Sequence, residues 1–215
     1  VQRILRDFPQ ARWHQYEPVN RDNAYAGARL AFGQPVEAQY NLDRADVILS
    51  LEADLVGAGP GQLRYARQFS RRRNPACPGG MNRLYVVESA WTVTGTNADH
   101  RLRVKPSEIT AYAVALAGEL GKRGVTLAPE IVGALPKGGA TVDAKFVSAL
   151  ADDLVKSKGK VAIALGAGQP RELHALVHAM HAGLESVGTT VRYYKALDAG
   201  RPLDRESLAQ LGEAL

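Results

Sequence analysis

Short apolar runs alternate along the chain with longer stretches in which apolar residues recur every three or four positions. Residues 46–51 (DVILSL) and 83–87 (RLYVV) are mostly apolar and bounded by charge, which is typical of strands buried in a parallel sheet. The longer stretches predict helices. The predicted strands are residues 11–17, 46–51, 83–87, 101–104, 160–165 and 190–194. The predicted helices are residues 21–32, 61–73, 107–121, 141–158, 170–187 and 204–211.

Strands that alternate with helices are connected by right-handed crossovers, which build parallel sheets covered on both faces. The pattern therefore predicts an α/β fold of Rossmann-like lobes, with mostly parallel sheets flanked by helices and with strands 46–51 and 83–87 adjacent and central. Glycine and proline interrupt the pattern at residues 126–140, which we interpret as a connection between lobes at residues 1–125 and 141–215. The second range is short for a lobe, so we expect an incomplete one.

Composition narrows the class of protein. With 215 residues, 46% of them hydrophobic and 23% charged, the chain resembles a soluble globular protein rather than a disordered, collagen-like or coiled-coil one. No apolar run reaches about 18 residues, so we expect no membrane span. Cys77 is the single cysteine, which excludes a disulfide framework, a multi-cysteine zinc site and a cysteine-ligated iron–sulfur cluster within the chain.

The net charge of +5 is mildly basic, which allows an anionic partner without requiring one. The chain begins at Val1 and shows no charged segment, apolar segment and cleavage site in that order. We therefore expect an internal fragment of a larger subunit, with any targeting signal outside it.

A glycine-rich turn between a predicted strand and a predicted helix is a candidate anion site. Gly57, Gly59 and Gly61 precede the helix, and Glu88 ends the next strand, where such folds place an acid for ribose hydroxyls. The spacing departs from the dinucleotide fingerprint, and Glu52 and Asp54 would repel a pyrophosphate. If any residues of this chain bind a cofactor, we expect these three glycines and Glu88, but a plain strand-to-helix turn is the favoured interpretation.

Three histidines share one face of a predicted helix. His174, His178 and His181 are spaced by four and three residues, but a metalloprotease helix would need Glu where Ala175 stands, and no further ligand lies at metal-binding spacing. We predict no metal site there and interpret the stripe as satisfied polar residues against a neighbouring segment. No Gly-x-Ser-x-Gly elbow occurs and Cys77 has no histidine nearby, so no catalytic residue is predicted.

Three arginines share another helix face. Arg64, Arg67 and Arg71 are the predicted partner-binding residues, because guanidinium groups bind carboxylates and phosphates well. The alternative is a solvated helix end, where cations complement the helix dipole. Nucleic acid is not expected, since the chain carries no known nucleic-acid-binding motif.

Whole phrases of the chain resemble a known family. They are residues 16–24 (YEPVNRDNA), 45–51 (ADVILSL), 81–89 (MNRLYVVES), 98–102 (ADHRL), 168–170 (GQP) and 174–180 (HALVHAM). They resemble the molybdopterin oxidoreductase-like region in the large iron–sulfur subunit of alternative complex III. The resemblance covers most of the chain, apart from the connection and the last dozen residues.

The chain departs from the wider molybdopterin oxidoreductase family where that family contacts its cofactor. The family's Gly-x-Asn-Pro turn is replaced by residues 51–55 (LEADL), its Asp-Pro-Arg by residues 88–90 (ESA), and its Pro-Gly-Thr-Asp by residues 106–109 (PSEI). Residues 17–20 offer no cysteine or serine as a metal ligand. These departures imply that molybdopterin is not bound.

The resemblance therefore implies a cofactor-less scaffold in a quinol-oxidising respiratory electron-transfer complex, with no catalysis by this chain alone. Its partners would be the other subunits, and its place the periphery of the bacterial inner membrane, on the periplasmic side. Iron–sulfur clusters would belong to a region outside this chain. The alternatives are part of the pterin-dinucleotide-binding region of an active molybdenum oxidoreductase, and a nucleotide-binding enzyme based on the glycine turns.

Overall fold

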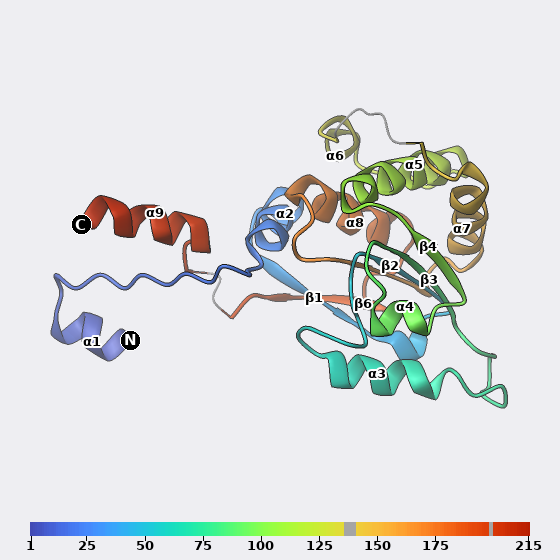
Figure 1. The fold of residues 1–215 in the computed structure, drawn as a ribbon, viewed down its shortest axis with the longest axis horizontal. Coiled ribbons are helices and arrows are strands. Elements are labelled where there is room, and N and C mark those ends of the chain that lie inside the picture. Colours follow the sequence, from blue (N-terminus) through green and yellow to red (C-terminus); the bar gives the residue numbers. More distant parts are fainter. Residues whose placement is uncertain (136–140, 198–199) are drawn as a thin grey trace.

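A four-stranded parallel sheet lies at the centre of the molecule (Figure 1). The computed structural model describes residues 1–135, 141–197 and 200–215. The strands follow the order β4-β3-β2-β5, and β2 pairs with β3 in register from Val47 with Arg83 to Leu51 with Val87. The predicted α/β fold and the adjacent inner position of these two strands are confirmed. The four strands are β2 (Val47–Leu51), β3 (Arg83–Glu88), β4 (His100–Arg103) and β5 (Val161–Leu165).

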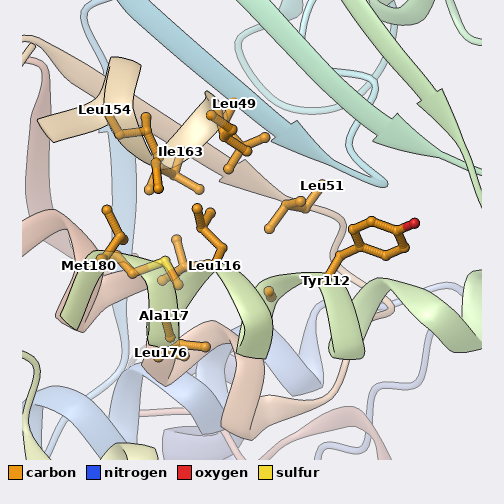
Figure 2. Close-up of a cluster of buried hydrophobic side chains, with 14 of the residues drawn as sticks. Leu49, Leu51, Tyr112, Leu116, Ala117, Leu154, Ile163, Leu176 and Met180 are labelled. Carbon is orange, nitrogen blue, oxygen red and sulfur yellow. The ribbon is translucent and has the colours of Figure 1, made fainter. Parts of the chain in front are cut away.

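Successive side chains of the strands point to opposite faces of the sheet, and each face has its own core. The larger core joins β2, β3 and β5 to three helices; Figure 2 shows part of it, including Leu49, Leu116 and Leu154. The smaller core lies on the other face, where Ile48 packs with Tyr65 and Phe69 of α3 (Gln62–Arg71). Burial on both faces explains the almost continuous apolar run of β2. The three helices of the larger core are α5 (Ile109–Lys122), α7 (Ala144–Lys156) and α8 (Arg171–Gly183).

Each predicted helix is found, with its ends shifted by a few residues. The structure adds short elements that the periodicity of the sequence did not predict. The remaining helices are α1 (Gln2–Asp7), α2 (Asp22–Phe32), α4 (Val93–Thr96), α6 (Pro129–Gly133), α9 (Asp204–Ala214) and the 3-10 turns η1 (Leu42–Arg44) and η2 (Pro106–Glu108).

An antiparallel pair accompanies the main sheet. Strand β1 (Val36–Tyr40) pairs with β6 (Val191–Lys195), with Ala38 opposite Tyr193. The strand predicted at residues 190–194 is therefore confirmed, whereas β1 was missed. Every residue of β1 is half-buried, so the strand lacks the clear alternation of buried and exposed side chains that marks a strand in a sequence.

The strand predicted at residues 11–17 is wrong. These residues form no regular structure, and most of them are exposed. His14 Nδ1 lies 3.2 Å from the Ser207 carbonyl oxygen and the Gln15 amide donates to Ser207 Oγ at 2.9 Å, so the segment lies against α9 and away from any strand (Figure 1). Without a neighbouring strand to complete its hydrogen-bond ladder, the segment does not form a strand.

The two predicted ranges of the chain contribute to one sheet. Strand β5, from residues 141–215, pairs in parallel with β2, from residues 1–125, along its whole length. The larger core likewise draws residues from both ranges. Of the predicted connection at residues 126–140, the structure describes residues 126–135, which include α6, and residues 136–140 lie outside the described part.

Candidate functional site

A cavity of about 420 Å³ opens at the carboxyl ends of β2 and β5. The chain leaves β2 toward β3 on one side, and returns from β4 through α5 and α7 to β5 on the other. Parallel sheets bind ligands where the strand order reverses in this way. The residues that line the cavity come from the loops after β2 and β5, from the start of α3, and from α2, β1 and α8.

The loop after β2 is held by carboxylates that bind the neighbouring loop. Glu52, with a left-handed φ of 51°, accepts hydrogen bonds from the amide of Ser89 at 2.8 Å and from its hydroxyl. Asp54 Oδ1 accepts from the amide of Thr94 at 2.9 Å and from its hydroxyl at 2.7 Å. Both carboxylates line the cavity, and each uses oxygen atoms to connect the loop after β2 to the loop after β3.

Glu88, a candidate for binding ribose, is likewise hydrogen-bonded to side chains of this chain. Its side chain is 1% exposed, receives a hydrogen bond from Arg101 Nε at 2.6 Å and another from Thr92 Oγ1 at 2.6 Å. Gly95 lies so close that a Cβ there would be 1.8 Å from Glu88 Oε1. Glu88 is thus enclosed by its own chain and does not line the cavity.

The three candidate glycines differ in their position relative to the cavity. Gly59 and Gly61 line the cavity, and both adopt left-handed φ angles of 89° and 83°, which glycine tolerates best. Gly57 is not part of the lining and packs on Asp54, whose carboxylate a Cβ at this position would meet at 2.3 Å. The turn thus combines a loop geometry that needs glycine with the start of α3, whose first turn carries no acidic side chain.

Arg64 bridges α3 and the antiparallel pair at the cavity. Its guanidinium donates to Gln39 Oε1 at 3.1 Å, to Asn41 Oδ1 at 2.9 Å and to the Tyr40 carbonyl at 3.2 Å. All three acceptors are uncharged, so the guanidinium keeps its full positive charge. On the opposite wall, Arg21 forms an ion pair with Glu37 at 3.0 Å, so the charges of these two residues cancel.

Two histidines of the stripe, His178 and His181, belong to a hydrogen-bond chain through Tyr193. The Ile163 amide of β5 donates to His181 Nε2 at 3.0 Å, so the ring proton of His181 lies on Nδ1, 3.0 Å from the Tyr193 hydroxyl. That hydroxyl lies 3.1 Å from His178 Nδ1. His181 thereby satisfies a backbone group on the free edge of β5. Tyr193, from a predicted strand, is the residue that joins the two histidines, and sequence spacing alone gave no sign of it.

Burial is the main cause of the histidines' low proton affinity, because it disfavours the charged form. It lowers the pKa of His181 to about 3 and that of His178 to about 4, with a smaller contribution in each case from the preceding histidine of the stripe. It also lowers the pKa of His174 to about 4, against an opposing effect from the backbone near Gly166. The three imidazoles are therefore neutral at pH 7.

His174 and His178 both line the cavity, and His174 differs because one of its ring nitrogens has no hydrogen-bond partner among the described residues. Its side chain is 7% exposed, and its Nε2 has no hydrogen-bond partner among the described residues. The described part of the chain contains no group of three histidine, cysteine, aspartate or glutamate side chains placed to hold a metal ion. The lining thus combines the cation of Arg64 with two neutral histidines, His174 and His178.

The other predicted partner-binding arginines lie apart from the cavity. Arg67 and Arg71 are exposed on α3, and neither forms an ion pair with a described residue. The next two arginines point inward instead. Arg72 pairs with Asp46 at 2.9 Å and Arg73 with Asp99 at 2.7 Å.

Comparison with known proteins leaves the family open, since the chain matches no protein-family model and no curated protein. Within the described residues, no helix combines the length and the apolar character that crossing a bilayer requires.

Proposed function

We propose that this chain is a cofactor-less scaffold domain of a molybdopterin oxidoreductase-like subunit in a quinol-oxidising respiratory electron-transfer complex. The observation that carries the proposal is that Glu52, Asp54 and Glu88 form hydrogen bonds within the chain itself. All three carboxylates stand at the carboxyl ends of the strands, where a related enzyme would contact its ligand. Glu52 and Asp54 are bound by Ser89 and Thr94 of the β3–β4 connection, and Glu88 is bound by Thr92 of that connection and by Arg101 of β4.

The cost of breaking those contacts favours a structural role for the three carboxylates. A buried carboxylate that turns toward a ligand leaves its former donors unsatisfied, which costs about 1–3 kcal/mol for each group. Ser89 and Thr94 would each lose two hydrogen bonds in this way, and Arg101 would lose its ion pair. These contacts thus hold the loops after β2 and β3 together.

On this proposal the chain holds no cofactor and has no catalytic activity alone. Its partners are the other subunits of a membrane complex, at the periplasmic side of the bacterial inner membrane, and iron–sulfur clusters belong to a region outside the chain. These features rest on the resemblance of the sequence, and the fold is compatible with them.

The cavity favours a second candidate, in which the chain is part of the pterin-dinucleotide-binding region of an active molybdenum oxidoreductase. A cavity of about 420 Å³ at the switch point of a parallel sheet is large enough for part of such a ligand. Arg64 and His174 would be its polar contacts, since both line the cavity and His174 has an unused ring nitrogen.

Cofactor analysis of the full-length protein separates the two candidates. The protein is purified from cells that also express a known molybdenum enzyme, which proves that the cofactor is supplied. We expect molybdenum by mass spectrometry, and pterin by fluorescence after oxidative release, to stay far below one equivalent per protein. One equivalent of both would overturn the scaffold proposal in favour of the second candidate.

A pair of isosteric variants tests the structural role of the carboxylates. Glu52→Gln and Asp54→Asn retain an oxygen that can accept hydrogen bonds from Ser89 and Thr94. We expect both variants to assemble into the complex and to leave its quinol oxidation unchanged. Normal assembly with lost quinol oxidation would contradict the scaffold proposal, because it would place the charge in the reaction.

A further inference from the structure

The surface formed by α3 and the loop after it carries positive charge without any compensating acid in its own sequence. Residues 56–87 contain six arginines and neither aspartate nor glutamate. Acids elsewhere in the chain pair with some of these arginines, so a local positive field arises from those that form no ion pair. Figure 1 shows α3 on the side of the sheet opposite α5 and α7, with no other helix over its outer face.

The six arginines fall into two groups. Three are paired with an acid: Arg72 with Asp46, Arg73 with Asp99, and the exposed Arg83 with Asp153. The others are Arg64, which meets only uncharged acceptors, and Arg67 and Arg71, which are exposed and form no ion pair within the described residues. Ion pairs within the fold thus neutralise three of the six arginines. Arg64, Arg67 and Arg71 form a row that keeps its positive charge.

We propose that Leu63, Arg64, Arg67 and Arg71, here termed the α3 face, form a docking surface for an acidic segment of a partner protein. The inference deepens the proposed scaffold function and rests on it for the presence of a partner, because it names the surface and the chemistry that recognises it. Leu63 is 82% exposed beside the arginines and gives the surface an apolar contact.

The spacing of the arginines defines the segment that fits. At 1.5 Å per helical residue, Arg64 and Arg67 are about 4.5 Å apart along the axis, and Arg67 and Arg71 about 6 Å apart. Carboxylates at positions i, i+3 and i+7 of a partner helix have the same spacing. The planar guanidinium groups of Arg67 and Arg71 can bind carboxylates through two parallel hydrogen bonds, which gives the pairing direction as well as charge complementarity. Arg64, whose guanidinium already donates to Gln39 and Asn41, contributes its charge.

The same surface is poorly suited to nucleic acid or to a membrane. Its aromatic residues Tyr65 and Phe69 are buried at 7% and 6% exposure, so none is available for stacking on bases. A helix that lies in a bilayer surface presents a row of large apolar side chains outward, whereas the outer side of α3 presents Leu63 among arginines. An acidic protein segment matches the positive charge of this surface. It needs neither exposed aromatic side chains nor an outward row of apolar ones.

The test measures binding of a labelled helical peptide with glutamates at i, i+3 and i+7 to the full chain, by fluorescence anisotropy at low and at physiological salt. A peptide with glutamine at those positions is the ligand control. The variant is Arg67→Glu with Arg71→Glu. The matched control variant is Arg103→Glu with Arg192→Glu, which changes the net charge equally at exposed arginines that form no ion pair within the described residues.

We expect the Arg67→Glu, Arg71→Glu variant to bind the glutamate peptide at least tenfold more weakly at low salt, and the matched control variant to bind within about twofold of the unmodified chain. An exposed ion pair contributes about fivefold to affinity at most, so loss of two pairs plus repulsion gives this range. The difference should shrink at physiological salt, because screening weakens exposed charges. Circular dichroism and the thermal midpoint verify that both variants fold.

Three results would overturn the proposal: equal weakening by the two variants, unchanged binding by the α3 variant, or tighter arginine-dependent binding of a DNA duplex or of phosphatidylserine vesicles than of the glutamate peptide. If Arg67→Glu with Arg71→Glu impairs folding, the milder Arg67→Gln with Arg71→Gln replaces it and the same comparison applies. Peptide binding does not depend on molybdenum content. Failure here with a molybdenum-free protein refutes the docking surface alone, whereas one equivalent of molybdenum refutes the scaffold alone.

Discussion

Glu88 and Arg101 show what a buried charge requires at the scale of single residues. Glu88 is 1% exposed, and the Nε of Arg101 lies 2.6 Å from its carboxylate. Arg101 in turn lies over the ring of Trp91, 4.7 Å from its centroid. Removal of one member of a buried pair is costly because the remaining charge has lost its partner while it stays out of water.

Arg101→Leu should therefore lower the free energy of unfolding by about 3 kcal/mol, since Thr92 remains as a hydrogen-bond donor to Glu88. Urea unfolding monitored by circular dichroism measures the change. Arg103→Leu is the control, because Arg103 is exposed and forms no ion pair within the described residues, and it should change the free energy by less than about 0.5 kcal/mol. Equal effects of the two substitutions would show that the Glu88 contact does not matter.

The buried histidines make stability depend on pH in a defined direction. The folded state keeps His174, His178 and His181 neutral down to pKa values of about 4, about 4 and about 3, whereas a histidine in the unfolded chain titrates near 6.5. Between pH 6.5 and about 4 the unfolded chain binds more protons than the folded one. Its free energy falls relative to the folded state, so the protein loses stability as the pH falls through this range.

We expect the free energy of unfolding to fall by about 1.4 kcal/mol per pH unit for each of these histidines below pH 6. Urea titrations at pH 7, 6 and 5 measure the slope. His174→Leu should reduce the slope by about one third, and the exposed His100→Gln should leave it unchanged. A slope that responds to His100 rather than to His174 would assign the effect to other groups. The range above pH 5 avoids Asp46, Asp99 and Asp153, whose lowered pKa values affect stability in more acidic solution.

At the scale of elements, close approach between α2 and α8 depends on one glycine. A Cβ on Gly27 would lie 2.4 Å from the Cβ of His174 and 2.6 Å from the carbonyl oxygen of Arg171. Backbone atoms cannot move away as a flexible side chain does. The two helices therefore pack at a distance that only glycine allows, and α2 carries Arg21 to the wall of the cavity at that distance.

Gly27→Ala should separate the two helices and lower the free energy of unfolding by about 1–3 kcal/mol. Gly118→Ala in α5 is the matched control, because a Cβ there meets no atom within 4 Å and alanine favours the helix by about 0.5–1 kcal/mol. Thermal unfolding of both variants measures the difference. A neutral Gly27→Ala would mean that α2 and α8 pack less closely than this geometry requires.

The elements that the sequence predicts best are those whose physical cause is local. Strands β2 and β3 follow from apolar runs, because burial on both faces favours apolar side chains at most positions; Ser50 and Glu88 are buried polar exceptions. Strand β1 escaped prediction because each of its residues is half-buried. Residues 11–17 were predicted as a strand, but their partner is α9, and only the tertiary structure brings residues 14 and 207 together.

The candidate site likewise contains some features that the sequence predicts and others that depend on tertiary structure. The glycine turn before α3 was visible in the sequence, because left-handed turns need glycine at Gly59 and Gly61. The contacts of Glu52 with Ser89 and of Asp54 with Thr94 were not, because they join loops that become neighbours only through the register of β2 with β3. Sequence spacing placed the histidines on one face of a helix, but the partner Tyr193 comes from β6.

At the scale of the whole molecule, residues 1–125 and 141–215 are expected to unfold together. Strand β5 pairs with β2 at every residue, and Leu154 of α7 is fully buried in a core shared with Leu49 and Leu116 (Figure 2). Two segments that share a sheet and a core lose both when either one unfolds, so a single cooperative transition is the physical consequence.

Leu154→Ala should lower the free energy of unfolding by about 2–5 kcal/mol, because it removes buried methyl groups and leaves a cavity. If the molecule unfolds as one unit, the amides of β3 should lose hydrogen-exchange protection as much as those of β5, although α7 belongs to the other range of the chain. Mass spectrometry of peptides that cover 83–88 and 161–165 measures both losses after the same exchange time. Loss of protection confined to residues 141–215 would contradict the shared unit, because it would show that β2 and β3 remain folded after β5 has left the sheet.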